Sequence, residues 1–188
     1  LGLFVISAAV VTTLLEYPHS PLHGLFADQA TRRLMIGLAM GATAIGLIYS
    51  PWGKRSGAHL NPAVTLTFYR LGKIGGIDAC SYVMAQFFGG ALGLWLVSRA
   101  IGKAVEHPAV NYVVTTPGPA GSGTAFVAEA LISFGLMLVV LMVSNTTSLN
   151  AWTGCVAGAL VATHIAIEAP LSGMSMNPAR TLASALGA

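Results

Sequence analysis

The chain has 188 residues, of which 55% are hydrophobic and 8% are charged, and its mean hydropathy is +0.75. Soluble globular proteins carry about a quarter charged residues, so this composition excludes an ordinary soluble domain and indicates a membrane protein. The formal net charge of +3 comes from basic residues scattered over polar connections, so a nucleic-acid partner is not predicted.

Apolar runs in chain order predict five membrane-spanning helices, because a helix needs about 20 apolar residues to cross a bilayer core of about 30 Å. The chain begins at Leu1 with no cationic stretch before the first run, so we interpret that run as a shortened span rather than a signal peptide. Cys80 and Cys155 lie inside separate runs, which favours small hydrophobes over a disulfide. The five runs lie at 1–15, 34–49, 79–98, 125–143 and 151–167.

A sequence echo indicates an internal duplication. Residues 56–66 read SGAHLNPAVTL and residues 172–182 read SGMSMNPARTL, with Asn61 and Asn177 separated by 177 − 61 = 116 positions. The predicted organisation is a first repeat at 1–101 and a second at 124–188. The polar, Pro/Gly-rich stretch 102–123 between them is predicted to be the connecting loop.

The number of spans predicts that the two repeats are inverted. Three spans in the first repeat place the start of the second on the opposite side of the membrane. Only two spans follow in the second repeat, and the 116-residue offset puts its third at about 195–214, outside this sequence. The expected fold is therefore an all-α membrane protein, an inverted repeat of three spans plus one re-entrant half-helix each, with the last span missing from a chain shortened at both ends.

Each Asn-Pro-Ala triplet predicts the start of a short helix. Asn is a good N-cap, and proline suits the first helical position because its missing N–H is not needed there. The predicted half-helices run from Pro62 to about Leu71 and from Pro178 to about Leu186. Non-helical backbone at membrane depth must be buried in protein or face a watery cavity, so the two positive helix ends are expected to meet at one small volume.

The paired triplets, with arginine after the second only, resemble the aquaporin and glycerol-facilitator (major intrinsic protein) family over essentially the whole chain. The resemblance implies that the two Asn amides donate to permeating water and interrupt its proton wire. It gives Arg180, in an otherwise small and apolar half-helix, a place in the selectivity filter, where it donates to the solute and repels cations. The implied pore-centre residues are Asn61, Pro62, Ala63, Asn177, Pro178 and Ala179.

The rest of the implied filter departs from the familiar water and glycerol patterns of the family. Counting three residues back from Asn177 gives Met174, and counting twelve back gives Ile165. A one-residue loop insertion would place His164 there instead. On the second span the family pattern suggests Met40, with Gly41 as the ungapped choice. A constriction of Met, His or Ile, Met and Arg matches neither pattern, and its two thioethers are flexible side chains.

Two polar residues are predicted to support the re-entrant loops. Glu129, in the fourth span, is expected to accept hydrogen bonds from the N–H groups of 172–177, since intramembrane carboxylates usually have interior partners. His59 is expected to be a loop residue with its hydrogen bonds satisfied rather than a gate.

His164 and Glu168 have an i, i+4 spacing that suits metal ligands, but no third ligand lies nearby, so no metal site is predicted.

The predicted function is a passive channel that conducts water in single file and excludes protons and ions, without cofactor or catalysis. Thr181 and Ala185 stand where glycerol facilitators tend to carry Asp and a basic residue, which favours water, whereas PLSG at 170–173 resembles a glycerol facilitator. Glycerol or another small neutral solute is therefore the alternative. Rival classes are a hydrolase using Ser175 and His164, or an ion-coupled transporter using Glu129. The resemblance further implies a homotetramer in a plasma or inner membrane.

Overall fold

The computed structural model describes all residues from Leu1 to Ala188, and all of its regular secondary structure is helical. Five long helices, four short ones and two 3-10 turns follow one another along the chain. They are α1 (Gly2–Glu16), α2 (Pro21–Leu25), α3 (Gln29–Tyr49), α4 (Pro51–Ser56), α5 (Pro62–Arg70), α6 (Gly76–Val105), η1 (Asn111–Val113), α7 (Gly121–Ser144), η2 (Asn150–Trp152), α8 (Thr153–Ser172) and α9 (Pro178–Ala185).

All five predicted apolar runs are helical, and four of these helices are long and apolar enough to cross a membrane. They are α3, α6, α7 and α8, whereas α1 is a shorter apolar helix of 15 residues. The two predicted half-helices also form, with 9 residues in α5 and 8 in α9. The all-α membrane fold expected from the sequence is therefore confirmed.

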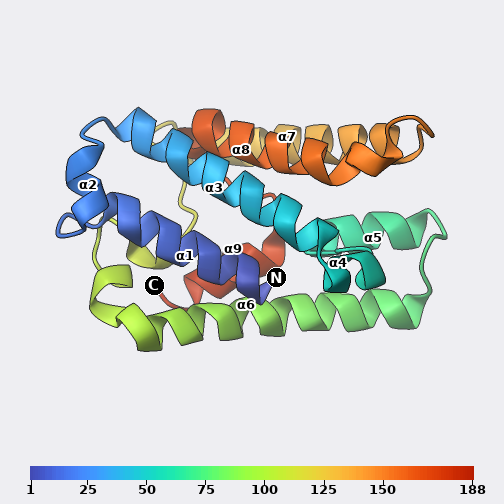
Figure 1. The fold of residues 1–188 in the computed structure, drawn as a ribbon, viewed down its shortest axis with the longest axis horizontal. Coiled ribbons are helices and arrows are strands. Elements are labelled where there is room, and N and C mark those ends of the chain that lie inside the picture. Colours follow the sequence, from blue (N-terminus) through green and yellow to red (C-terminus); the bar gives the residue numbers. More distant parts are fainter.

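Small residues let the long helices pack closely in two crossing pairs, α3 with α8 and α1 with α6. A Cβ on Gly41 would lie 2.5 Å from the carbonyl oxygen of Gly158, and a Cβ on Gly93 would lie 2.6 Å from that of Gly2. Neither position has room for a side chain, because the backbones are in contact. Figure 1 shows α3 crossing between α8 and α1, with α6 along the opposite edge.

The two half-helices occupy the middle of the bundle and point away from each other (Figure 1). Their N-terminal ends are adjacent, because each capping Asn donates to the backbone of the other loop, Asn61 to Met176 O and Asn177 to Leu60 O. This arrangement places two helix N-termini, each carrying partial positive charge, beside one volume.

The connecting segment is shorter than the predicted loop at 102–123. Residues 102–105 extend α6 beyond a bend at Ile101 (φ −133°, ψ 29°), and α7 begins at Gly121. The extension is stabilised by tertiary packing, because Val105 is fully buried in a core cluster with Val5 and Leu94. The predicted loop boundaries were therefore wrong by a few residues at each end, and η1 adds a single turn within the loop.

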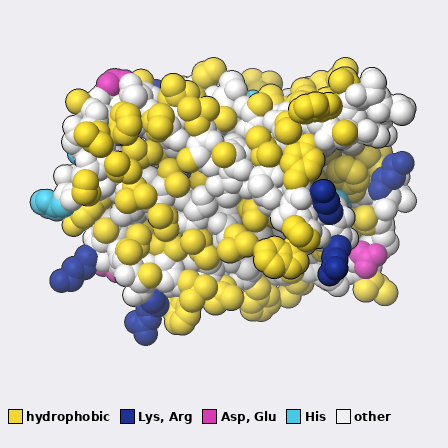
Figure 2. Space-filling view, in the orientation of Figure 1, with side chains coloured by type: hydrophobic (Ala, Val, Ile, Leu, Met, Phe, Trp, Pro, Cys, Tyr) yellow, Lys and Arg dark blue, Asp and Glu magenta, His cyan; other side chains and the backbone are white.

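The outer surface is that expected of a protein surrounded by lipid. Figure 2 shows hydrophobic side chains over the face between the two ends of the bundle, with the Lys, Arg and acidic side chains gathered toward those ends. Large apolar residues on α6 and α7 are strongly exposed, including Phe88 and Phe134. Such a surface is stable in a hydrocarbon environment and would be an aggregation liability in water.

Candidate functional site

A cavity of about 620 Å³ runs through the bundle and contacts both re-entrant loops. One face of each surrounding helix lines it, as the spacing of three or four residues in the lining shows. On α3 this face carries Gln29, Arg33, Ile36, Met40, Ala44 and Ile48, and on α8 it carries Thr153, Gly154, Ala157, Val161, Ile165 and Ala169.

Asn61 and Asn177 both line this cavity, and each fills two roles at once. The Oδ1 atom of Asn61 caps α5 by accepting from Ala63 N at 2.9 Å. That of Asn177 caps α9 by accepting from Ala179 N at 3.1 Å and from Arg180 N at 3.2 Å. Capping therefore uses the oxygen of each amide and leaves both N–H groups for other acceptors.

One N–H of each amide crosses to the opposite loop. The Nδ2 atom of Asn61 donates to Met176 O at 2.5 Å, and that of Asn177 donates to Leu60 O at 2.8 Å. A side-chain amide has two N–H donors, so one remains on each Asn, at the wall of the cavity. The pair thus joins the two loops and still offers two donors to a guest in the cavity.

The other residues of the two triplets do not line the cavity. Pro62 and Pro178 occupy the first helical position of α5 and α9, where their fixed φ suits the turn. Ala179 is fully buried, and Ala63 and Pro178 are exposed on the outer side. Of the six pore-centre residues implied by the resemblance, the structure brings only the two Asn to the cavity wall.

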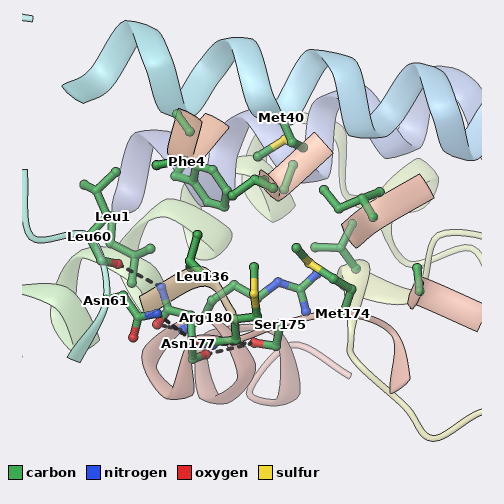
Figure 3. A pocket seen from close by; sticks show the side chains of 18 of the residues that line it. Leu1, Phe4, Met40, Leu60, Asn61, Leu136, Met174, Ser175, Asn177 and Arg180 are labelled. Atoms are coloured by element: carbon green, nitrogen blue, oxygen red, sulfur yellow. Dashed lines mark hydrogen bonds between the residues drawn. The ribbon is translucent and has the colours of Figure 1, made fainter. Parts of the chain in front are cut away.

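Arg180 lines the cavity in the first turn of α9, next to the loop residue Met174 (Figure 3). Its Nη1 atom is enclosed and has no hydrogen-bond partner, and no carboxylate forms an ion pair with it. Val64 lines the same cavity from the equivalent position of the first repeat. The guanidinium therefore presents free donors, and a charge without an ion-pair partner, to whatever occupies the cavity.

The structure distinguishes between the alternatives left open for the constriction. Met40 lines the cavity and is buried, whereas Gly41 faces Gly158 on α8. Ile165 shares the lining face of α8 with residues four positions away, whereas His164 lies outside the wall. Met40, Ile165, Met174 and Arg180 all line this one cavity, and three of these four side chains are apolar. Figure 3 shows Met40 across the cavity from Met174 and Arg180.

The hydrogen bonds predicted for Glu129 are present. Its carboxylate accepts from Ser172 Oγ at 2.8 Å, from Ser175 N at 2.6 Å and from Met176 N at 2.7 Å. Ser172 is the last residue of α8, and the two N–H groups belong to the loop that ends at Asn177, where they have no helical partner. The carboxylate thus fixes the path of the backbone that carries Met174 and Asn177.

The first loop has a counterpart that sequence reasoning missed. Gln86, buried in α6, donates through Nε2 to His59 O and to Thr65 Oγ1, the latter at 2.9 Å. The available signal was a lone amide in an apolar span. The expectation that His59 is fully satisfied was wrong, because its Nδ1 is enclosed without a partner while its ring lies 5.1 Å from that of Phe68 and 5.2 Å from that of Tyr82.

The residues named for rival chemistries are not assembled into a site. Ser175 Oγ contacts Asn177 O at 2.9 Å and Thr181 Oγ1 at 2.6 Å, and the enclosed Nδ1 of His164 has no partner. A Ser175–His164 pair is therefore not formed. Glu168 is buried with no donor to either oxygen, and no group of three or more His, Cys, Asp or Glu residues is placed to hold a metal ion.

This fold and this cavity define a class: an integral membrane protein in which two half-helices meet inside a helical bundle around a solute-sized passage. Residues 2–188 match the sequence pattern of the family described as "Major intrinsic protein". The chain belongs to the major intrinsic protein family, whose members are channels.

Similar proteins support this assignment at the level of sequence and of fold. The chain is 37% identical over 154 residues to "Probable aquaporin AqpM" of Archaeoglobus fulgidus, covering 81% of this chain and 62% of that protein. It is 34% identical over 190 residues to "Aquaporin NIP2-2" of Zea mays, covering 99% of this chain and 62% of that one. The chain therefore spans about 62% of the length of these relatives.

A solved structure shares the fold. The X-ray structure of the aquaglyceroporin from Plasmodium falciparum superposes with a TM-score of 0.76 at 23% sequence identity, covering 99% of this chain and 76% of that one. At this identity the likeness concerns the fold alone.

Proposed function

We propose that the full-length protein is a passive channel that conducts water in single file and excludes protons and ions. The observation that carries the proposal is that Asn61 and Asn177, at two helix N-termini, line one cavity and each keep an N–H that no protein acceptor uses. A water between them accepts from both amides, so its own protons point outward along the file. The positive helix ends add a barrier to cations at the same place.

Arg180 supplies the second element of selectivity in this proposal. Its unpaired guanidinium donates to the passing solute and repels cations at the constriction formed with Met40, Ile165 and Met174. The remaining walls are aliphatic or thioether groups, which make no strong hydrogen bond to water. Water therefore crosses the constriction with few competing partners, which favours rapid passage.

The alternative is conduction of glycerol or another small neutral solute. It is supported by the three apolar side chains of the constriction, which suit the hydrocarbon side of a polyol while Arg180 donates to its hydroxyls. Relatives and fold neighbours include both kinds of channel by their printed names, aquaporins and an aquaglyceroporin.

Osmotic experiments on proteoliposomes separate the two functions. Vesicles holding the full-length protein are shrunk in sucrose to measure water efflux, then exposed to glycerol to measure re-swelling. A water channel shrinks faster than protein-free vesicles and re-swells at their rate. Re-swelling faster than that of protein-free vesicles supports the alternative. Rates equal to those of protein-free vesicles in both steps contradict a channel.

A pair of neighbouring substitutions tests the assigned wall of the constriction. Ile165→His adds a hydrogen-bonding ring to the cavity wall and should lower glycerol flux relative to water. His164→Ile changes the adjacent residue, which lies outside the wall, and should leave the ratio unchanged. A larger effect from residue 164 than from residue 165 contradicts the assignment.

We also infer a homotetramer in a plasma or inner membrane, on the resemblance to the family. The exposed apolar faces of α6 and α7 supply area for subunit contacts. Chemical cross-linking of the full-length protein in membranes tests this, with a ladder ending at four subunits as the expected result and monomers only as the contrary one.

A further inference from the structure

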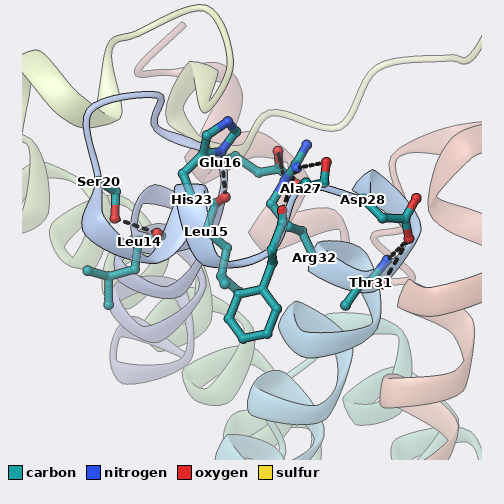
Figure 4. A network of polar contacts seen from close by, with 10 residues as sticks. Leu14, Leu15, Glu16, Ser20, His23, Ala27, Asp28, Thr31 and Arg32 are labelled. Atoms are coloured by element: carbon teal, nitrogen blue, oxygen red, sulfur yellow. Dashed lines mark hydrogen bonds and ion pairs between the residues drawn. The ribbon is translucent and has the colours of Figure 1, made fainter.

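Two adjacent arginines at the α2 end of the bundle have different environments. Arg32 is buried and paired: its Nε lies 3.0 Å from Glu16 Oε2, and its Nη1 donates to Phe26 O at 2.8 Å and to Ala27 O at 2.9 Å (Figure 4). Arg33 instead lines the cavity and has no carboxylate partner.

Arg33 is held against the wall near the constriction. Its Nε donates to Ala166 O at 2.9 Å, and Ala166 directly follows Ile165. On α3 it precedes Met40 by 40 − 33 = 7 residues. At 1.5 Å per residue this is about 10 Å along the helix axis, or two turns on the same face. Arg33 thus lies just outside the constriction, on the side of the α2 end.

No carboxylate forms an ion pair with Arg33, including Glu168, which is buried on α8 two residues after Ala166. Glu16 lines the same cavity, but Arg32 neutralises it at 3.0 Å. Asp28 is exposed to solvent and caps α3 through Thr31, with Thr31 N at 2.7 Å and Thr31 Oγ1 at 2.8 Å from Oδ2. One positive charge from Arg33 therefore remains at the mouth, where walls of low dielectric constant concentrate its field.

We propose that Arg33 is a second specificity-determining residue. Its positive charge, just outside the constriction, repels cations before they reach Arg180. The inference rests on the proposed channel function. A cation or hydronium ion that approaches from the α2 end meets Arg33 first and Arg180 next, within one cavity. Water and neutral solutes feel no such repulsion. The Nε bond to Ala166 leaves the remaining donors of Arg33 free toward the cavity.

The test uses Arg33 variants in an Arg180→Val background, where the inner barrier is absent. Arg33→Gln removes the charge while its amide still reaches for the Ala166 carbonyl, and Arg33→Lys keeps the charge. Arg55→Gln removes an exposed arginine at the opposite end, on α4, and is the matched control. Water permeability, proton conductance and potassium conductance are measured on the same proteoliposomes.

We expect the Arg33→Gln, Arg180→Val double variant to conduct protons and potassium several-fold faster than Arg180→Val alone. The Arg33→Lys and Arg55→Gln double variants should match Arg180→Val, and water flux should stay high in all of them. Equal ion conductance in the Gln double variant and in Arg180→Val overturns the inference.

Two further outcomes separate this inference from its premises. If Arg180→Val alone does not raise proton or potassium conductance, a raised conductance in the Arg33→Gln, Arg180→Val double variant still supports the cation-repelling role of Arg33. No rise in either variant overturns the inference. Wild-type protein without water flux overturns the proposed function and this inference together.

Discussion

The loop before α5 and the loop before α9 begin with the same hydrogen bond. Ser56 Oγ accepts from Ala58 N at 3.3 Å, and Ser172 Oγ accepts from Met174 N at 3.0 Å. The glycine that follows each serine is left-handed, with φ of 70° in the first loop and 81° in the second. Ala58 and Met174 are also left-handed, at 52° and 50°. The repeated sequence therefore adopts the same backbone conformation in both loops.

Beyond this shared path the two loops are held by opposite chemistry. The first is anchored by a donor, Gln86, which binds a loop carbonyl and a hydroxyl. The second is anchored by an acceptor, Glu129, which receives one hydroxyl and two N–H groups. The comparison teaches that a repeat preserves the path of the chain while its supports adapt to whichever backbone groups remain unpaired.

Removing the anchors should therefore have unequal effects, and the largest is expected from Glu129→Leu. It leaves three donors without a partner, each costing about 1–3 kcal/mol when enclosed. Gln86→Leu leaves one carbonyl without a donor, while the Thr65 hydroxyl still donates to Asn61 O, so the loss should be smaller, about 1–3 kcal/mol. Thermal unfolding of the detergent-solubilised full-length variants measures both. Equal destabilisation would contradict the difference between the two anchors.

Arg180→Val gives the second repeat the residue that Val64 provides in the first, so the fold should be kept. Losing the charge and its donors should raise proton and cation leak while water flux is kept or increased. Proton leak and water permeability are recorded from one reconstituted sample. Loss of water flux without a new leak, in folded protein, would mean that Arg180 supports the half-helix rather than selecting solutes.

The two left-handed glycines supply a smaller effect. Alanine in this conformation costs about 1–2 kcal/mol at either position. At Gly173 the added Cβ would also lie 2.9 Å from Thr115 Cα and from Thr116 N, whereas at Gly57 its nearest neighbours are His59 ring atoms at 3.5 Å. Gly173→Ala should therefore destabilise the protein more than Gly57→Ala, as thermal unfolding would show. The reverse order would contradict the packing of the second loop against 115–116.

The smallest effect concerns mercury. Met174 lines the cavity and the two cysteines do not, so the wild-type protein should show little block by mercurials. Met174→Cys should create a block that a reducing thiol reverses, because the sulfur then faces the constriction. The matched variant in the first repeat is Ala58→Cys, which places a thiol at the equivalent cavity position. Strong reducible block of a Cys80→Ser, Cys155→Ser double variant would contradict the assigned pore wall.

Local signals explain why much of the fold could be predicted from the sequence. The N-cap Asn and the following proline define the start of each half-helix within a few residues, so α5 and α9 match their predicted bounds closely. The N–H groups of the loop before α9 need an acceptor, and this requirement similarly indicated Glu129. These features depend on chemistry that lies within one short segment or one conspicuous side chain.

Features set by tertiary packing escaped prediction. The choice between His164 and Ile165 depends on how α8 is rotated against α3, which no local pattern specifies. The extension of α6 to Val105 depends on a core built with α1. Gln86 and Arg33 have no repeated motif around them, and only the fold brings them to the first loop and to the cavity.

The central claim is that water passes while protons do not, and one paired measurement on wild-type proteoliposomes tests it most directly. Vesicles containing the full-length protein and a pH-sensitive dye are shrunk osmotically, and their proton conductance is then recorded under a pH gradient. The account predicts water permeability well above that of protein-free vesicles, with unchanged proton conductance. Water permeability at the protein-free level, or proton conductance that rises with the amount of protein, would contradict it.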